Sequence, residues 1–324
     1  MAVLEVNDLR MYFALEGKGC VKAVDGLAFS LERGRTLGIV GESGCGKSSL
    51  ATTLLQVLPD NGRVTSGSIL LDGVDVLQLG EEVLEKSYRW KKIAMVFQGA
   101  MNSFDPVFKV GDQLVEAIVK HSDLTEKEAR MRMVELLESV RIERSVANYY
   151  PHEYSGGMKQ RAMIAMALAL NPEVLIADEP TTALDVIAQA QILKLMRQLQ
   201  SERNISMILI THDVAIVSEM SDDIAVMYAG KIVEHGSTEG VILSPGHPYT
   251  KGLLESVPVI QRGRRKKLES ITGTPPNLLD PPRGCRFHPR CPYRIPVCDE
   301  TEPELAEFDG SHVVACHRML EKLW

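Results

Sequence analysis

The sequence predicts an α/β protein with a mainly parallel core sheet, an antiparallel β-subdomain, a helical insert and a small cysteine-containing C-terminal domain. Three observations support this class. Short strands of alternating polarity fill the first 36 residues, continuous apolar runs then alternate with helical stretches, and prolines and cysteines become dense beyond residue 240. Alternation of buried strands with helices is typical of a parallel sheet. A chain of 324 residues is long enough for one large domain and a smaller one.

The strands are predicted from two kinds of apolar pattern. Residues 2–6 and 28–31 alternate in polarity, which is typical of antiparallel strands with one solvated face. Continuous apolar runs predict strands that are buried on both faces, and a later pair of runs predicts a closing hairpin over 224–233. The buried runs are 37–40, 93–97, 174–177 and 205–210.

The stretch from about 99 to 170 is predicted to be a helical insert. Thr125 and Glu128 fit a capping box, with Leu124 just before it. Apolar residues then recur at helical spacing at Met133, Leu136, Leu137 and Val140. An apolar helix from Ser155 to Leu170 follows.

The composition changes near residue 241, where we predict a domain boundary between residues 1–240 and 241–324. Four of the six cysteines lie in the second segment. The basic run Arg262–Lys267 is interpreted as a solvated linker, with contact to anionic lipid headgroups as the alternative.

Composition excludes several classes. The formal net charge of −7 argues against a protein that binds nucleic acid by neutralising many phosphates. No apolar run approaches the roughly 18 residues of a membrane helix, and the first residues lack a signal-peptide pattern. We therefore expect a cytosolic chain whose cysteines are thiols or metal ligands.

The segment Gly41–Ser48 matches the phosphate-loop pattern G-x-x-x-x-G-K-[ST] between a predicted strand and a helix. Glycines allow backbone N–H groups to point at phosphates, and the following helix adds its positive end. Lys47 supplies a charge to the β- and γ-phosphates, and Ser48 a hydroxyl to Mg²⁺. The residues predicted to contact the nucleotide here are Ser43, Gly44, Cys45, Gly46, Lys47, Ser48 and Ser49.

Polar residues at the ends of predicted strands complete a hydrolytic site. Asp178 is expected to hold Mg²⁺ through its water shell, and Glu179 to orient or deprotonate the attacking water. Gln98 is expected to reach Mg²⁺ or the water, and His212 the γ-phosphate.

A second anion site is predicted at Ser155-Gly156-Gly157, which opens an apolar helix. A serine hydroxyl, exposed N–H groups and a helix N-terminus together favour a phosphate. A simple N-cap is the plainer interpretation. Two phosphate sites in one domain suggest that this turn grips ATP held by a partner subunit.

This ordered set of motifs, with Ala183-Leu184-Asp185, resembles the ATP-binding-cassette (ABC) ATPases over residues 1–240. The resemblance implies a head-to-tail dimer with two ATP molecules between the subunits, where the serine-glycine-glycine turn acts in trans. It also implies that Phe13, or its neighbour Tyr12, stacks on adenine. The turn departs from the commonest form, with Tyr154 and Met158 in place of leucine and glutamine. We therefore predict that backbone, helix end and Ser155 grip the nucleotide of a non-identical partner.

Other segments are similar to the D-type ATPase subunit of dipeptide/oligopeptide importers. They are Met101–Pro106, His247–Thr250, Gly273–Pro276 and Gly284–Cys291. The resemblance implies an ATPase that powers peptide import at the cytoplasmic face of the membrane. Its partners would be a paralogous ATPase, two permease subunits and, indirectly, an extracytoplasmic substrate-binding protein.

The tail cysteines Cys285, Cys291, Cys298 and Cys316 are spaced C-x₅-C-x₆-C-x₁₇-C. In the family this pattern is associated with a [4Fe–4S] cluster. Four thiolates suit zinc equally, and His288, His312 and His317 leave mixed ligation open. Reduced cysteines without a metal are the plainer alternative.

Two other functions remain open from the sequence. The same importer type carries oligosaccharides or metal chelates, because the binding protein and permease select the cargo. A soluble ABC protein acting on ribosomes or nucleic acid is the alternative from another class, although the chain has one cassette and an acidic charge balance.

Overall fold

The computed structural model describes residues 1–99, 103–256 and 271–319. Two segments singled out in the sequence, Met101-Asn102 and Arg262–Lys267, lie outside the described residues. The contacts divide the chain into two compact units that interleave along the sequence. Unit 1 comprises Met1–Leu4, Leu31–Arg35 and Leu71–Ile208, and unit 2 comprises Glu5–Ser30, Thr36–Leu70 and Leu209–Trp324. The boundary near residue 241 stays a prediction.

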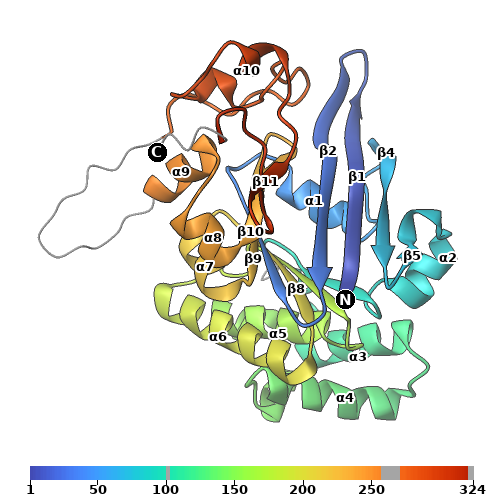
Figure 1. Cartoon of the computed structure of the whole chain (residues 1–324). Coiled ribbons are helices and arrows are strands. Elements are labelled where there is room, and N and C mark those ends of the chain that lie inside the picture. The colour runs from blue at the N-terminus through green and yellow to red at the C-terminus, as the bar shows by residue number, and fades with distance from the viewer. Residues whose placement is uncertain (100–102, 257–270, 320–324) are drawn as a thin grey trace, which may run out of the picture. The chain divides into compact units, whose positions relative to one another are not determined.

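Unit 2 begins with strands of alternating burial. β1 and β2 form a hairpin, and β4 lies on the other side of β1 (Figure 1). The alternating polarity in the sequence therefore marks strands with one buried face, as expected. Their bounds are β1 (Ala2–Leu15), β2 (Gly19–Glu32) and β4 (Gly62–Leu71).

The second sheet of unit 2 has the order β11-β12-β10-β9-β3. β3 runs parallel to β9, while β9, β10, β12 and β11 pair antiparallel in turn. The hairpin predicted over 224–233 is confirmed as β9 and β10. The bounds are β3 (Thr36–Val40), β9 (Asp223–Tyr228), β10 (Lys231–Ser237), β11 (Ala306–Asp309) and β12 (His312–Val314).

The helices of unit 2 follow these strands along the chain, and α7 packs against β3 and α8. All are short, and α10 lies in the C-terminal region that contains the cysteines (Figure 1). Their bounds are α1 (Lys47–Leu54), α7 (Val214–Met220), α8 (Thr238–Leu243), α9 (Pro248–Glu255), η6 (His288–Arg290) and α10 (Val297–Glu300).

Unit 1 contains the parallel pair β6 and β7, with every residue of both strands buried. Its four long helices pack on one another: α3 on α4, α4 on α5 and α5 on α6. The bounds are β6 (Ile93–Val96), β7 (Val174–Asp178), α3 (Val110–His121), α4 (Glu126–Ser139), α5 (Gly156–Ala167) and α6 (Val186–Arg203).

Shorter elements complete unit 1, and the chain passes into unit 2 within β8 (Ser206–Thr211). The shorter elements are β5 (Val74–Asp75), η1 (Val76–Gln78), α2 (Glu81–Val83), η2 (Leu84–Tyr88), η4 (Arg144–Asn148) and η5 (Pro151–Glu153).

Local signals in the sequence set the helix starts. The capping box is confirmed, because Thr125 accepts the Glu128 N–H while the Glu128 carboxylate accepts the Thr125 N–H. The four apolar residues predicted to share one face of α4 are buried. The apolar helix ends at Ala167 rather than Leu170, because apolar residues of the following turn are also buried and extend the pattern.

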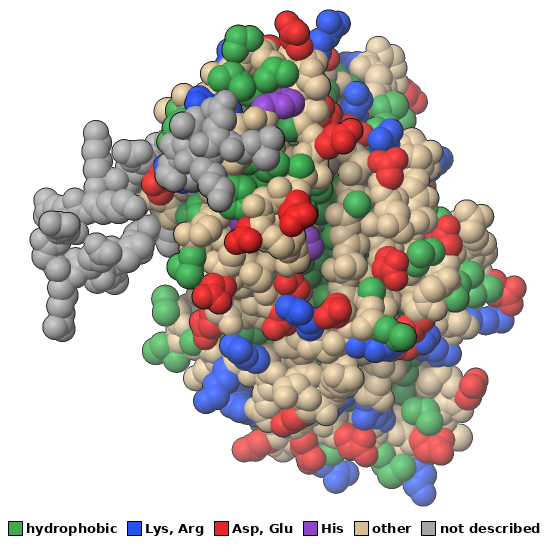
Figure 2. Space-filling model, in the orientation of Figure 1, with side chains coloured by type: hydrophobic (Ala, Val, Ile, Leu, Met, Phe, Trp, Pro, Cys, Tyr) green, Lys and Arg blue, Asp and Glu red, His purple; other side chains and the backbone are tan. Residues whose placement is uncertain are grey.

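Acidic and basic side chains are interspersed on the face drawn in Figure 2. This mixture differs from the single-sign basic field of a typical nucleic-acid-binding surface. Among the described helices, none has the length and apolar character required to cross a membrane.

Glu234 of β10 is fully buried and links the chain on either side of the undescribed segment 257–270. Its carboxylate accepts the N–H groups of Gly246 and His247 at 2.7 and 2.9 Å, and it lies 2.7 Å from His312 Nε2. A buried carboxylate is tolerated only when its oxygens have such partners. His247 in turn caps α9, because its Nδ1 accepts the Tyr249 N–H at 3.0 Å.

Burial makes His247 a pH-dependent element of stability. Burial lowers the pKa of His247 to about 4 from 6.5, although the Glu234 carboxylate opposes the shift. The unfolded state therefore binds more protons between these two values, so the free energy of unfolding falls as pH drops through this window. The loss between pH 6.5 and pH 4 is about 3 kcal/mol.

The variant His247→Asn keeps a capping oxygen but does not titrate. We expect its unfolding free energy to fall less steeply between pH 6.5 and pH 4 than that of the wild type, measured by urea denaturation at each pH. An equally steep fall of the unfolding free energy with pH in the two proteins would contradict the assignment of this pH dependence to His247.

Candidate functional site

The phosphate loop lies between β3 and α1 in unit 2, as the sequence predicts. Two of its glycines are required by close backbone contacts. A Cβ on Gly41 would lie 2.1 Å from the Met227 carbonyl oxygen, and one on Gly46 would lie 2.0 Å from the Ala23 carbonyl oxygen. Gly46 also has a φ of +107°, which favours glycine. The loop backbone is therefore wedged against β9 and β2.

Lys47 is buried within this loop. Its ammonium donates to the carbonyl oxygens of Gly41 and Glu42 at 2.7 and 3.0 Å, and Ser48 is exposed on the first turn of α1. Cys45 is buried, and burial raises the pKa of its thiol. The loop thus presents a cation and exposed helix-start groups, which is the chemistry that binds phosphate.

The two aromatic candidates on β1 differ in their contacts. The Tyr12 hydroxyl donates to Asp25 at 2.6 Å, and burial together with this bond raises the pKa of Tyr12 to about 12. Asp25 is also paired with Arg286 from the C-terminal region. Tyr12 is therefore committed to a polar network, which favours Phe13 as the residue that stacks on adenine.

The predicted catalytic acid lies in unit 1. The register of β6 and β7 pairs Val96 with Ala177, which brings the residues beyond the two strand ends together. Gln98 Nε2 donates to Glu179 Oε2 at 2.9 Å. The Thr182 hydroxyl donates to the same oxygen at 2.9 Å. A hydrogen bond thus joins two residues that are 81 positions apart in the sequence.

Glu179 has a φ of +46°, an uncommon conformation for a non-glycine residue. Such conformations cluster at functional sites. Asp178, the last residue of β7, is buried. Thr182 was missed in the sequence, although its spacing of three residues from Glu179 is compatible with a turn.

The serine-glycine-glycine turn caps α5. The Ser155 hydroxyl oxygen accepts the Met158 N–H at 3.2 Å, which leaves the hydroxyl able to donate a hydrogen bond. Gly156 and Gly157 are the first helical residues, whose N–H groups have no partner within the helix. The plain N-cap interpretation and the anion-site interpretation are thus compatible in one geometry.

This turn borders a cavity of about 360 Å³ within unit 1. The segment Ala183–Asp185 lines the opposite part, and Asp185 caps α6 by accepting the N–H groups of Ile187 and Ala188. Arg161 also lines the cavity and donates to Gln191. Arg161 was missed in the sequence, because an arginine one turn into a helix carries no motif.

The remaining candidates are distributed over the two units. His212 follows β8 directly and is exposed in unit 2. Unit 2 also contains the phosphate loop, Phe13 and Tyr12. Unit 1 contains the other candidates, which are Gln98, Ser155 to Gly157, Asp178 and Glu179.

The four tail cysteines are free thiols in unit 2. Burial, together with the other cysteines of the set, raises the pKa of Cys285 to about 12 and that of Cys291 to about 11. Within the described ranges, no group of three or more His, Cys, Asp or Glu side chains is arranged to hold a metal ion. The neighbouring thiols contribute to these raised pKa values, and deprotonating all four would require a compensating cation.

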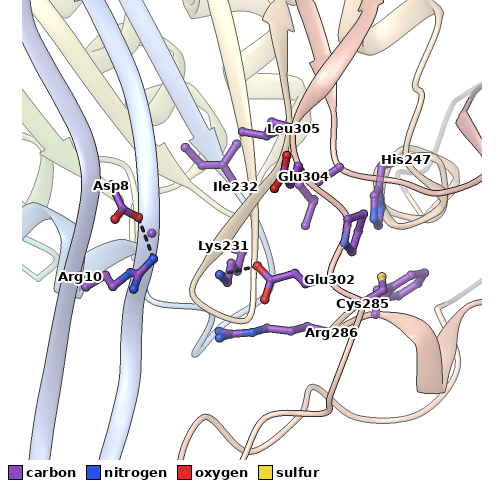
Figure 3. Close-up of a pocket in the computed structure, with 15 residues that line it drawn as sticks. Asp8, Arg10, Lys231, Ile232, His247, Cys285, Arg286, Glu302, Glu304 and Leu305 are labelled. Atoms are coloured by element: carbon purple, nitrogen blue, oxygen red, sulfur yellow. Dashed lines mark hydrogen bonds and ion pairs between the residues drawn. The ribbon is translucent and has the colours of Figure 1, made fainter. Parts of the chain in front are cut away.

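A cavity of about 400 Å³ lies elsewhere in unit 2 (Figure 3). Asp8 and Arg10 reach it from β1, and Lys231 and Glu302 line it side by side as an ion pair. These charges pair internally, Arg10 with Asp8 and Lys231 with Glu302. The cavity is therefore a neutralised pocket beside the Asp25–Arg286 pair.

The ABC transporter family profile matches residues 24–182, and the profile of the oligopeptide/dipeptide transporter C-terminal region matches residues 233–298. The oligopeptide transport ATP-binding protein OppD of Bacillus subtilis is 46% identical over 96% of this chain and 87% of the relative. OppD of Escherichia coli is 46% identical over 99% and 95%, and the dipeptide transport ATP-binding protein DppD of Bacillus subtilis is 46% identical over 97% and 94%.

Solved structures agree. The dimeric structure of the ATP-binding cassette MJ0796 bound to ADP and Pi has a TM-score of 0.64 and 26% identity, covering 72% of this chain and 98% of that one. The structure of cbiO1 from Clostridium perfringens has a TM-score of 0.65 and 29% identity, covering 75% and 91%.

The fold and the phosphate loop thus define an ABC ATPase, a member of a class of proteins that bind and hydrolyse ATP. Within this class, the chain belongs to the family of oligopeptide/dipeptide transport ATP-binding proteins. The resemblance drawn from the sequence motifs is confirmed.

The close packing of the loop gives a direct prediction. In Gly41→Ala the new methyl group collides with the Met227 carbonyl oxygen, so the loop must shift. We expect ATP affinity to fall by about tenfold or more, because overpacking typically costs about 1–3 kcal/mol. Isothermal titration with ATP and Mg²⁺ measures the effect.

Gly80→Ala is the matched control. Gly80 has a φ of −73°, and no atom lies within 4 Å of its added Cβ. Wild-type affinity in Gly80→Ala is expected, and wild-type affinity in Gly41→Ala would show that the contact does not constrain the loop.

Proposed function

We propose that this chain is the ATP-binding and ATP-hydrolysing subunit of a membrane importer for di- and oligopeptides. The observation that carries the peptide assignment is the match of residues 233–298 to the oligopeptide/dipeptide transporter C-terminal region. The 46% identical relatives named for oligopeptide and dipeptide transport support it across nearly the whole chain. An importer of the same type for oligosaccharides or metal chelates is the alternative.

The residue roles in this proposal follow from the chemistry of each group. Lys47 and the loop N–H groups bind phosphate, and Ser48 and Asp178 hold Mg²⁺, with Gln98 as a further candidate ligand. Glu179 polarises the attacking water, and His212 contacts the γ-phosphate. Support for the role of Glu179 comes from two hydrogen bonds, since Gln98 and Thr182 both donate to one carboxylate oxygen and so orient the side chain.

The proposal includes a heterodimer with a paralogous ATPase, in which Ser155, Gly156 and Gly157 bind the partner's nucleotide. The cavity in front of this turn and the outward N–H groups of α5 support an anion site there. A solved cassette of similar fold is described as dimeric with bound ADP and Pi. Met158 lacks a side-chain amide, so the backbone and Ser155 must supply the donors.

The partners in this proposal are two permease subunits and, indirectly, an extracytoplasmic substrate-binding protein. The chain would sit peripherally at the cytoplasmic face of the membrane. ATP binding closes the dimer and hydrolysis reopens it, and the permeases convert this motion into transport. Purification of the tagged chain from membranes, followed by mass spectrometry, tests the assembly. Permeases and a second ATPase support it, whereas ribosomal RNA would support the alternative class.

The sharpest test of the hydrolytic assignment is Glu179→Gln. This variant keeps the size of the side chain but removes the negative oxygen that polarises water. We expect ATP binding to persist while the hydrolysis rate falls by about 10²-fold or more. Hydrolysis at the wild-type rate in Glu179→Gln would refute the role of Glu179. The control is Glu202→Gln, on the exposed surface of α6, for which an unchanged hydrolysis rate is expected.

We also propose that Cys285, Cys291, Cys298 and Cys316 hold a [4Fe–4S] cluster, with zinc as the alternative. The support is the four-thiol donor set, together with the contribution of the other cysteines to the raised pKa values of Cys285 and Cys291. The cluster would brace a small region that contains few regular elements. Analysis of iron, inorganic sulfide and zinc in anaerobically purified protein separates the cases, and a protein free of all three with normal stability would contradict the proposal.

A further inference from the structure

Glu42, the second residue of the phosphate loop, is held at each of its polar groups. Its carboxylate accepts two bonds from Arg290, Nη1 to Oε2 at 2.6 Å and Nη2 to Oε1 at 2.9 Å. Its backbone N–H donates to the Tyr249 hydroxyl at 2.8 Å, and its carbonyl oxygen accepts from Lys47 at 3.0 Å. The phosphate-binding lysine is therefore one residue removed from two side chains of the C-terminal region.

Arg290 is itself firmly fixed. Only 5% of its side chain is exposed. Its Nε donates to the Thr272 carbonyl oxygen at 2.9 Å, and Nη1 lies 3.3 Å from the Tyr228 hydroxyl. The guanidinium also lies over the rings of Tyr228 and Phe287, at 5.8 and 6.0 Å from their centroids. A planar guanidinium with two parallel bonds to a carboxylate fixes orientation as well as distance.

Tyr249 is equally constrained. It is fully buried on α9, and its ring packs against Tyr228 and Phe287 with centroids 4.6 and 5.5 Å away. Its hydroxyl accepts from the loop, so any shift of α9 moves the acceptor of the Glu42 N–H. Tyr228 and Phe287 thus pack against both Tyr249 and Arg290, the two residues that hold Glu42.

We propose that Arg290 and Tyr249 are positioning residues for the phosphate loop, and that they link ATP affinity to the packing of the cysteine-bearing segment 284–298. This inference rests on the proposed role of the loop in ATP binding. Arg290 and Tyr249 act through Glu42, not on the phosphates. They keep the Glu42 carbonyl in place for Lys47, and Arg290 belongs to the same segment as Cys285 and Cys291. Because linkage is reciprocal, bound nucleotide also stabilises this segment.

The first experiment measures the affinity of the full-length chain for a fluorescent ATP analogue with Mg²⁺. We expect Arg290→Gln to weaken binding by about tenfold, within the range typical of coupled sites, and Arg290→Lys to recover part of the loss. Tyr249→Phe is expected to weaken binding less, because it removes one neutral hydrogen bond. Thermal melting of each variant is recorded in parallel.

Arg294→Gln is the matched control. Arg294, in the same segment, also makes two bonds to a carboxylate, that of the neighbouring Asp299. Its hydrogen bonds and ion pairs within the described part of the chain do not involve the phosphate loop, and its side chain is half-exposed. Wild-type affinity is expected for this variant. Equal losses in Arg290→Gln and Arg294→Gln would overturn the inference, as would a folded Arg290→Gln protein that binds the analogue like the wild type.

A second measurement uses the wild-type chain and so does not depend on a variant that folds. Amide hydrogen exchange over residues 284–298 is expected to slow when the ATP analogue binds. Unchanged exchange at saturating nucleotide would overturn the linkage. Failure of the wild type to bind the analogue, with Lys47→Ala as the negative reference, would instead refute the proposed function.

Discussion

The constraint on which the nucleotide site depends is the close backbone packing of the phosphate loop. Gly41 and Gly46 leave no space for a side chain against the carbonyl oxygens of Met227 and Ala23. The Gly230 N–H donates to the Cys45 carbonyl at 2.8 Å and ties the tip of the β9–β10 hairpin to the loop. A loop fixed in this way binds phosphate without first having to be ordered, and preorganisation of this kind raises affinity.

The same principle operates in unit 1 with different groups. β6 and β7 are parallel and in register, so the residues that follow them emerge at one edge. Gln98 and Thr182 then fix one oxygen of Glu179. The carboxylate is held by hydrogen bonds and by a left-handed backbone conformation, so the proposed general base is oriented before substrate arrives. In both units, therefore, the candidate site residues follow the ends of buried strands, and contacts with nearby turns fix the orientation of these residues.

Much of this could be predicted from the sequence, because the signals are local. The alternating strands, the strand–loop–helix at Gly41, the capping box at Thr125 and the cap at Ser155 each depend on a few neighbouring residues. The sequence placed Gln98 and Glu179 at strand ends, but their hydrogen bond was not predicted, because it also depends on the order and register of the strands. The family resemblance then supplied the roles that no spacing defines.

The hydrogen bonds of Tyr249 and Arg290 to Glu42 could not be predicted in this way. Its partners Tyr249 and Arg290 are 207 and 248 residues further along the sequence. Neither a tyrosine nor an arginine in a proline-rich segment indicates a contact with a phosphate loop. The short strands β11 and β12 were missed for a similar reason, since three or four residues carry too little periodicity. Only the folded chain shows that Tyr249 and Arg290 contact the phosphate loop.

In the proposed arrangement, the Arg290–Glu42 pair couples the packing of segment 284–298 to the affinity for ATP. A double-mutant cycle with Glu42→Gln, Arg290→Gln and the double variant tests this most directly, with ATP affinity as the readout. If Arg290 acts on ATP affinity through Glu42, the double variant binds ATP about as well as the weaker single variant, because both changes break the same ion pair. Losses that simply multiply would contradict it, since the two residues would then act on ATP independently.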